Sequence, residues 1–147
     1  MDYTFQLLET PTEQRASFDL MRVLRPHLSD PDAYAAQLSR QARQGYRLLA
    51  ISNGQGMVGL AGYRELENLI YGRFIYVDDL VVSPQLQGSG VGATLLNAVR
   101  EEAFRRGCDH FVLDTGLHMA LAQRFYFRQG LLARGMHFTE KLSEAHP

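Results

Sequence analysis

The chain has 147 residues, of which 46% are apolar, 21% charged and 10% aromatic. Its 15 Lys and Arg residues oppose 16 Asp and Glu residues, which gives a formal net charge of −1. Chains of this length usually fold as one unit, so we expect a single domain over residues 1–147. The near-neutral charge argues against a protein that mainly binds nucleic acid or an anionic membrane, because both need a basic surplus.

The sequence carries no signal for an oxidising compartment or a membrane. Cys108 is the only cysteine and cannot form an intramolecular disulfide. Residues 1–8 have neither a basic nor an apolar leader region, and no apolar run approaches the roughly 20 residues that span a bilayer. We therefore expect a cytoplasmic protein with no membrane partner.

Two helices are predicted near the start of the chain. In residues 12–25 apolar side chains recur at a spacing of three, with Thr12 as the candidate N-cap and Pro26 as the stop. Asp30 can cap a second helix, and Gly45 can end it in the left-handed conformation. The chain is therefore expected to begin with a helical pair.

Downstream, runs of apolar and β-branched residues between turn signals are typical of strands. We predict strands in five segments: residues 46–52, 57–66, 74–82, 111–114 and 132–142. Helical periodicity is present in two others: residues 90–106 and 119–129. An antiparallel hairpin followed by a strand-helix-strand unit predicts a mixed α+β sheet with helices on both faces. A binding crevice is expected where the strand direction changes.

A glycine cluster, Gly88-Ser89-Gly90-Val91-Gly92, leads from a predicted strand into a predicted helix. Glycine-rich turns of this kind hold phosphates, because the backbone can approach the ligand and the helix N-terminus adds partial positive charge. A nucleoside-triphosphate loop would need Gly-Lys-Ser/Thr at its end. Here Ala93 follows Gly92, so that interpretation lacks its lysine.

A dinucleotide site is the second interpretation of the cluster. Gly88, Gly90 and Ala93 fit G-x-G-x-x-G/A, and Asp114 stands 21 residues beyond Ala93, near where a ribose-binding acid is expected. In the dinucleotide-binding motif the first glycine directly follows the strand, whereas here residues 83–87 lie between the strand and Gly88. Only one strand-helix-strand unit follows where that fold needs several.

The third interpretation takes the cluster as Gln87-x-x-Gly90-x-Gly92, preceded by the strand residues 77–82. Here the sequence resembles the GCN5-related N-acetyltransferase (GNAT) superfamily, whose acetyl-CoA loop carries Arg/Gln-x-x-Gly-x-Gly/Ala between a strand and a helix. Residues 122–131 resemble the family's A-x-x-(Phe/Leu)-Tyr-x-x-x-Gly-Phe segment. Together the two motifs favour this family over the dinucleotide interpretation.

The resemblance implies a mostly antiparallel sheet in which acetyl-CoA lies between two splayed parallel strands, here residues 74–82 and 111–114. It implies that backbone groups of three strand residues bind the pantetheine arm: Leu80, Val81 and Val82. It also implies that backbone amides of the loop hold the pyrophosphate: Gln87, Gly88, Ser89, Gly90, Val91 and Gly92. A diphosphate needs several converging donors, which such a loop can supply without side-chain charge.

Tyr126 is the predicted general acid, by resemblance, because the departing thiolate needs a proton that a phenol can donate; the alternative is a core tyrosine. The general base is left open among four side chains: Asp78, Asp79, Glu65 and His118. Strand alternation would send Asp78 and Asp79 to opposite faces, with Asp78 on the face of Leu80 and Val82. Asp78 is therefore the favoured base.

Glu65, Asp79 and His118 are the predicted acceptor contacts. The family often has Asn seven residues before the tyrosine, where this chain has Met119, and the departure leaves that cofactor contact open. No grouping of His, Cys and Asp has the spacing of a metal site, so no metal is expected.

The sequence thus predicts an N-acetyltransferase in which a primary amine attacks acetyl-CoA directly in a ternary complex. Acidic residues indicate an amine acceptor, with a small-molecule amine favoured over a protein amino group. The alternatives are a non-catalytic acyl-CoA sensor and a dinucleotide-binding domain. Many relatives pair through C-terminal strands, so the resemblance also implies that a homodimer can form.

Overall fold

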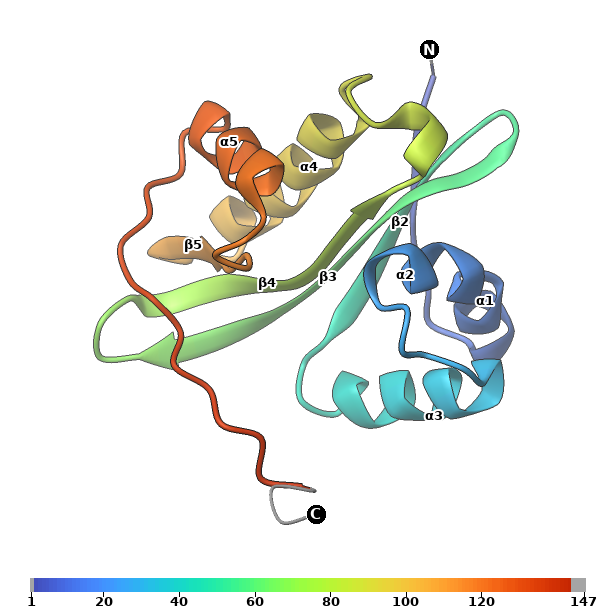
Figure 1. The fold of residues 1–147 in the computed structure, drawn as a ribbon, viewed down its shortest axis with the longest axis horizontal. Coiled ribbons are helices and arrows are strands. Elements are labelled where there is room, and N and C mark those ends of the chain that lie inside the picture. Colours follow the sequence, from blue (N-terminus) through green and yellow to red (C-terminus); the bar gives the residue numbers. More distant parts are fainter. Residues whose placement is uncertain (1, 144–147) are drawn as a thin grey trace. The chain divides into compact units, whose positions relative to one another are not determined.

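The computed structural model describes residues 2–143. The chain divides into two compact units, one ending at Leu113 and the other beginning at Asp114. Within the described residues, the first unit holds a β-sheet with helices, and the second holds one helix followed by an irregular segment. Figure 1 shows the course of the chain through both units. The predicted single domain over residues 1–147 stays a prediction.

The sheet of the first unit has five strands in the spatial order β1-β2-β3-β4-β5. The strands are β1 (Thr4–Leu7), β2 (Arg47–Asn53), β3 (Gly56–Asn68), β4 (Gly72–Val82) and β5 (His110–Leu113). Neighbours from β1 to β4 pair antiparallel, whereas β4 and β5 pair parallel. A parallel pair needs a crossover connection, which α4 supplies. The predicted mixed sheet is confirmed.

The helices of the first unit cover both faces of its sheet. The helices are α1 (Pro11–Ala16), α2 (Phe18–Leu24), α3 (Pro31–Ala42), α4 (Val91–Arg105) and, in the second unit, α5 (Ala120–Arg128). In the first unit, α1, α2 and α3 lie on one face of the sheet and α4 on the other (Figure 1). A separate apolar cluster lies between each face of the sheet and the helices that cover it, because both faces must be shielded from water.

The cap signals near the N-terminus are partly confirmed. Asp30 accepts a hydrogen bond from the Asp32 amide at the start of α3, as predicted. The predicted cap Thr12 is wrong: Thr10 is the N-cap of α1, in a capping box with Glu13. The expected single helix is also divided, since α1 ends before Ser17 and α2 begins after it.

Two strand predictions differ from the structure. β1 was not expected, because three of its four side chains are exposed and it lacks an apolar alternation; it exists by pairing with β2. The predicted strand at residues 132–142 is wrong, since no strand lies in the described part of the second unit. Those described residues offer no second strand to receive its backbone hydrogen bonds.

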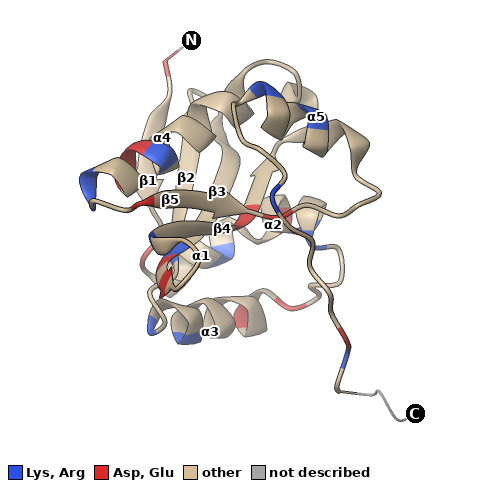
Figure 2. Ribbon diagram, turned by 90° about the vertical axis from the view of Figure 1, so that its left-hand side faces the viewer, with Lys and Arg blue, Asp and Glu red and all other residues tan. Residues whose placement is uncertain are grey.

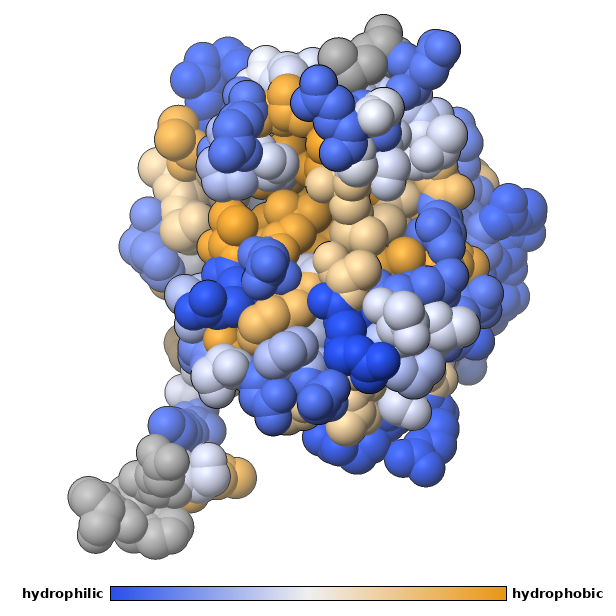
Figure 3. Space-filling model, turned by 90° about the vertical axis from the view of Figure 1, so that its right-hand side faces the viewer, coloured by the Kyte–Doolittle hydropathy of each residue, from blue (hydrophilic) through white to orange (hydrophobic). Residues whose placement is uncertain are grey.

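The two apolar clusters lie on opposite faces of the sheet. One contains Phe18 and Met21 from α2 and Leu38 from α3, and the other contains Leu95 and Val99 from α4. Apolar side chains also reach the surface among polar ones on the face in Figure 3. Among the described residues, no helix is long and apolar enough to cross a membrane.

Candidate functional site

The glycine-rich loop joins β4 to α4. It starts with a short 3-10 turn, Pro84–Leu86, after which Gly88 and Gly90 have φ angles of 82° and 93°. Non-glycine residues rarely adopt such angles. A Cβ atom at either position would meet no heavy atom within 4 Å. The backbone of this loop is therefore open to a ligand.

The N-terminus of α4 presents backbone amides toward this loop. Gly90 is the N-cap, and the Thr94 amide donates to its carbonyl oxygen at 3.1 Å. The backbone amides that come before Thr94 in the first turn have no acceptor within the helix. The helix dipole adds partial positive charge at the same place. Residues 83–99 contain no Lys or Arg. An anion bound here would be held by backbone amides, which suits a diphosphate.

One edge of β4 is left open by the sheet. β5 pairs with residues 74–77 of β4 and ends at Leu113, while β4 continues to Val82 and pairs there with β3. Successive strand residues direct backbone groups to alternate sides. Some backbone groups of residues 78–82 therefore face away from β3, beyond the end of the pairing with β5.

The open part of β4 begins at a β-bulge. Tyr63 pairs with Val77 and Gly62 with Asp79, so Asp78 is an extra residue on β4. A bulge interrupts the alternation of side chains, and the expected sorting of Asp78 and Asp79 to opposite faces therefore does not apply. Asp78 instead faces Arg64 of β3.

Asp78 forms a bidentate ion pair with Arg64. Arg64 Nε donates to Oδ2 at 3.0 Å and Nη2 donates to Oδ1 at 2.7 Å. Burial raises the pKa of the Asp78 carboxyl, while the hydrogen bonds from Arg64 act to lower it. The net direction is upward, which makes Asp78 a stronger base than an exposed aspartate.

Asp79 is bound at both carboxylate oxygens. Arg25 Nε donates to Oδ1 at 3.0 Å, and the Tyr46 hydroxyl donates to Oδ2 at 2.7 Å. Arg25 is the C-cap of α2, and Pro26 after it disfavours a helical conformation there. Burial raises the pKa of Tyr46 well above 10, so the phenol remains a proton donor.

Glu65 lies away from the two aspartates, opposite Ile75 in the β3–β4 register. Arg73 donates to it at 2.9 Å and Arg106 at 3.3 Å. The hydrogen bond from Arg73 is the main reason that the pKa of Glu65 is lowered. The structure therefore does not bring Glu65 together with Asp78 and Asp79.

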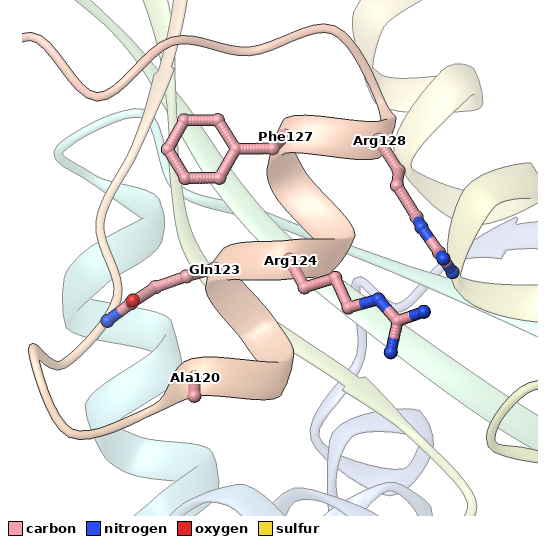
Figure 4. Close-up of a pocket in the computed structure, with 5 residues that line it drawn as sticks. All are labelled: Ala120, Gln123, Arg124, Phe127 and Arg128. Carbon is pink, nitrogen blue, oxygen red and sulfur yellow. The ribbon is translucent and has the colours of Figure 1, made fainter.

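Tyr126 lies on α5 of the second unit, packed edge-on against Phe125 with ring centroids 5.4 Å apart. Burial raises the pKa of its phenol, which keeps it protonated. A shallow hollow on α5 is lined by Ala120, Gln123, Arg124, Phe127 and Arg128. In Figure 4 the side chains of Gln123 and Phe127 point to one side of α5, and those of Arg124 and Arg128 point to another. Figure 2 shows basic but no acidic positions on this helix.

The loop before α5 holds His118, another predicted site residue of the second unit. Gln123 Nε2 donates to the carbonyl oxygens of Gly116 and Leu117, each at 3.0 Å, and so ties the loop to the helix. His118 lies in this loop, directly before the N-cap Met119. His137 Nε2 lies 3.0 Å from Asp114 Oδ2. Among the described residues, no group of three or more His, Cys, Asp or Glu side chains could hold a metal ion.

The model of the acetyltransferase (GNAT) family matches residues 6–131. This chain is a GNAT protein. An aminoalkylphosphonate N-acetyltransferase of Salmonella typhimurium is 33% identical over 112 residues, covering 76% of this chain and 71% of that protein. A mouse thialysine N-epsilon-acetyltransferase is 36% identical over 62 residues, which cover 42% of this chain and 36% of the mouse protein. A Trypanosoma brucei acetyltransferase structure has the same fold, with a TM-score of 0.78 at 21% identity, covering 96% of this chain and all of that one.

The GNAT assignment makes the chain an acetyl-CoA-dependent N-acetyltransferase by family and replaces the dinucleotide alternative. The residues present fit that co-substrate, because the loop of Gly88 and Gly90 is open and the first turn of α4 faces it with unpaired amides. A diphosphate satisfies such amides. Residues 78–82, which lie beyond the end of the pairing with β5, directly precede this loop.

Three polar residues of this GNAT site were missed in the sequence: Arg25, Tyr46 and Arg64. Arg25 and Tyr46 bind Asp79 from segments far away in the chain, and Arg64 binds Asp78 from the neighbouring strand β3. Arg25 before Pro26 was visible only as a helix end. Two adjacent acids inside a strand were the one available signal, since buried carboxylates need partners, but the sequence did not say which arginines supply them.

Proposed function

We propose that this GNAT protein transfers the acetyl group of acetyl-CoA to the primary amine of a small aminoalkyl compound. The observation that carries the proposal is the continuity of the donor features in one strand-loop-helix segment. The open edge of β4 runs directly into the glycine loop and the N-terminus of α4. One extended ligand with a polar arm and a diphosphate suits that arrangement.

The donor would be bound mainly by backbone groups. Leu80, Val81 and Val82 lie on the part of β4 beyond the end of β5, where main-chain groups can pair with an amide-containing arm. The amides of the loop would take the diphosphate: Gln87, Gly88, Ser89, Gly90, Val91 and Gly92. Bound acetyl-CoA supplies an activated acetyl group and a thiolate leaving group.

Tyr126 is proposed as the general acid that gives its proton to the departing thiolate. Its raised pKa supports the role, because the phenol carries its proton throughout the neutral range. Its position in the motif formed by residues 122–131 also supports the role. A change to Phe removes the proton and keeps the ring.

Asp78 is proposed as the base that removes the proton from the attacking amine. Its pKa is raised by burial, and a carboxylate with a higher pKa accepts a proton more readily. Each carboxylate oxygen has two acceptor sites, so the bidentate contact with Arg64 leaves acceptor capacity on both. The carboxylate is only partly buried and water can reach it.

A small acceptor is supported by the relatives, one of which is named for aminoalkylphosphonate and another for thialysine. The structure argues against a polycationic acceptor, because Glu65, Asp78 and Asp79 are each paired with arginine. These acids offer little uncompensated negative charge to a polyamine. His118 stays a predicted acceptor contact.

The proposal is tested by thiol release from acetyl-CoA with an aminoalkylphosphonate, thialysine, spermidine and a short peptide with a free amino terminus. We expect turnover with the first or second of these. Tyr126→Phe should lower kcat by about 10²-fold or more. The matched control is Tyr71→Phe, since Tyr71 lies on the β3–β4 turn and makes ring contacts with Phe74 and His110.

Three outcomes would contradict parts of the proposal. Failure to bind acetyl-CoA would overturn the whole function. Binding without turnover on any amine would favour the acyl-CoA sensor instead. Turnover that Tyr126→Phe leaves unchanged would remove Tyr126 as the acid while the transferase function stands.

A further inference from the structure

The bulge in β4 is held by three side chains from other parts of the chain: Arg25, Tyr46 and Arg64. The ladder between β3 and β4 skips Asp78, so this residue lacks the regular backbone partner that its neighbours have. Arg25 Nη2 donates to the Asp78 carbonyl oxygen at 2.9 Å and thereby binds a main-chain group at the irregularity. One hydrogen bond thus ties the end of α2 to the bulged residue.

The same guanidinium binds the next residue along the strand. Arg25 Nε donates to Asp79 Oδ1 at 3.0 Å, while Tyr46 holds the other carboxylate oxygen. A planar guanidinium presents several donors in fixed directions, so Arg25 fixes the Asp78 main chain relative to the Asp79 side chain. The Asp79 side chain is only 16% exposed, which reduces competition from water.

The contact between Arg25 and the bulge lies where it can affect the backbone direction of the end of β4. Residues 80–82 directly follow the bulge, and β5 no longer supports the strand there. With one sheet neighbour instead of two, the direction of this segment depends strongly on how the bulge is held. A rotation of the peptide at the bulge would turn every following backbone N–H and C=O group away from its place.

We propose that Arg25 is a positioning residue for the donor site: it clamps the β-bulge at Asp78 and Asp79 and so sets the direction of the β4 backbone that receives acetyl-CoA. The consequence for acetyl-CoA rests on the proposed function, whereas the clamp itself concerns the protein alone. Arg25 touches no reacting group and acts through the strand. Its loss therefore affects donor affinity more than the chemical step.

Arg25→Ala is the test variant and Arg22→Ala its matched control. Arg22 lies on the same helix and also donates to a carbonyl oxygen, that of Leu28, but in the described part of the chain it forms no hydrogen bond or ion pair with β4. The first readout is amide hydrogen exchange of the ligand-free protein. We expect exchange in residues 78–82 to become about tenfold faster in Arg25→Ala, the factor for one lost hydrogen bond to a charged group, with β2 unchanged.

The second readout is the split between KM and kcat. We expect Arg25→Ala to raise the KM for acetyl-CoA about tenfold, with kcat within about twofold of wild type, and Arg22→Ala to change neither. An unchanged exchange rate in residues 78–82, or a rise spread evenly over residues 2–113, would overturn the clamp. So would an increase confined to the KM of the amine.

The two readouts separate this inference from the proposed function. If the wild type neither binds nor uses acetyl-CoA, the proposed function fails, and hydrogen exchange still decides whether Arg25 holds the bulge. If acetyl-CoA turns over normally and Arg25→Ala leaves its KM unchanged, the positioning role fails while the function stands.

Discussion

The Tyr46 hydroxyl, on the residue directly before β2, donates a 2.7 Å hydrogen bond to the carboxylate of Asp79 in β4. The phenol passes over β3 at Gly62, where a side chain would occupy the same space as the ring. Burial raises the pKa of Tyr46 well above 10, so the phenol stays protonated and keeps donating. This contact links the residue before β2 to β4, across β3.

Gly62→Ala should destabilise the first unit, because the added Cβ overlaps the Tyr46 ring and neither can move freely in the core. We expect a loss of about 1–3 kcal/mol in the free energy of unfolding, typical of overpacking. Urea unfolding followed by circular dichroism measures it. Gly54→Ala is the control, since a Cβ there meets nothing within 4 Å. Equal losses in the two variants would contradict the proposed overlap.

Gly90→Ala should weaken CoA binding by strain in the loop. Gly90 has φ of 93° and open space around its Cα, so alanine meets no clash but disfavours the left-handed backbone. We expect the Kd for CoA, measured by calorimetry, to rise about tenfold. Gly45→Ala is matched in both respects, with φ of 89° and nothing within 4 Å, and should leave that Kd unchanged. Similar increases in both would point to general destabilisation.

Asp78→Asn should lower kcat by about 10²–10⁴-fold if Asp78 is the base. In the wild type, kcat/KM should fall as pH drops through the pKa of Asp78, which lies above the ordinary aspartate value of about 3.9. The raised pKa of Tyr126 puts loss of the acid above about pH 10. The exposed Asp19→Asn variant is the control, and a retained acid limb in Asp78→Asn would assign the base elsewhere.

Glu65 should contribute stability that depends on pH. Hydrogen bonds from Arg73 lower its pKa in the folded protein, so the ionised form is favoured there. This stabilisation is present above the unfolded pKa of about 4.3 and is lost as pH falls through the lower folded value. Urea unfolding at about pH 5 and about pH 3 should show a smaller pH-dependent loss in Glu65→Gln than in wild type. A change of the same size in the exposed Glu101→Gln would contradict this assignment.

Local signals in the sequence predicted much of the fold. Asp30 marked the start of α3, and Gly45 marked a helix end where the backbone does adopt a positive φ. The glycine loop was recognised from spacing alone, because left-handed turns and exposed amides depend on residues that are neighbours in the chain. Helix caps and turns need no information from distant segments.

Features that depend on distant partners were not predicted. β1 has little apolar pattern and forms because its backbone pairs with β2, which lies about forty residues further along the chain. The strand expected at residues 132–142 has an apolar pattern but no strand partner within the described part of its unit. Pairing across the chain, and not side-chain pattern, decided both cases.

By itself, the sequence determined the family, the mixed sheet and the loop that suits a diphosphate, because each is written in short contiguous motifs. Only the tertiary structure decided what the two β4 aspartates do. The register between β3 and β4 makes Asp78 an extra residue, and it brings Arg64 to Asp78. Folding of α2 against the sheet brings Arg25 to Asp79. Strand register and helix docking arise from contacts between remote segments, which no local pattern records.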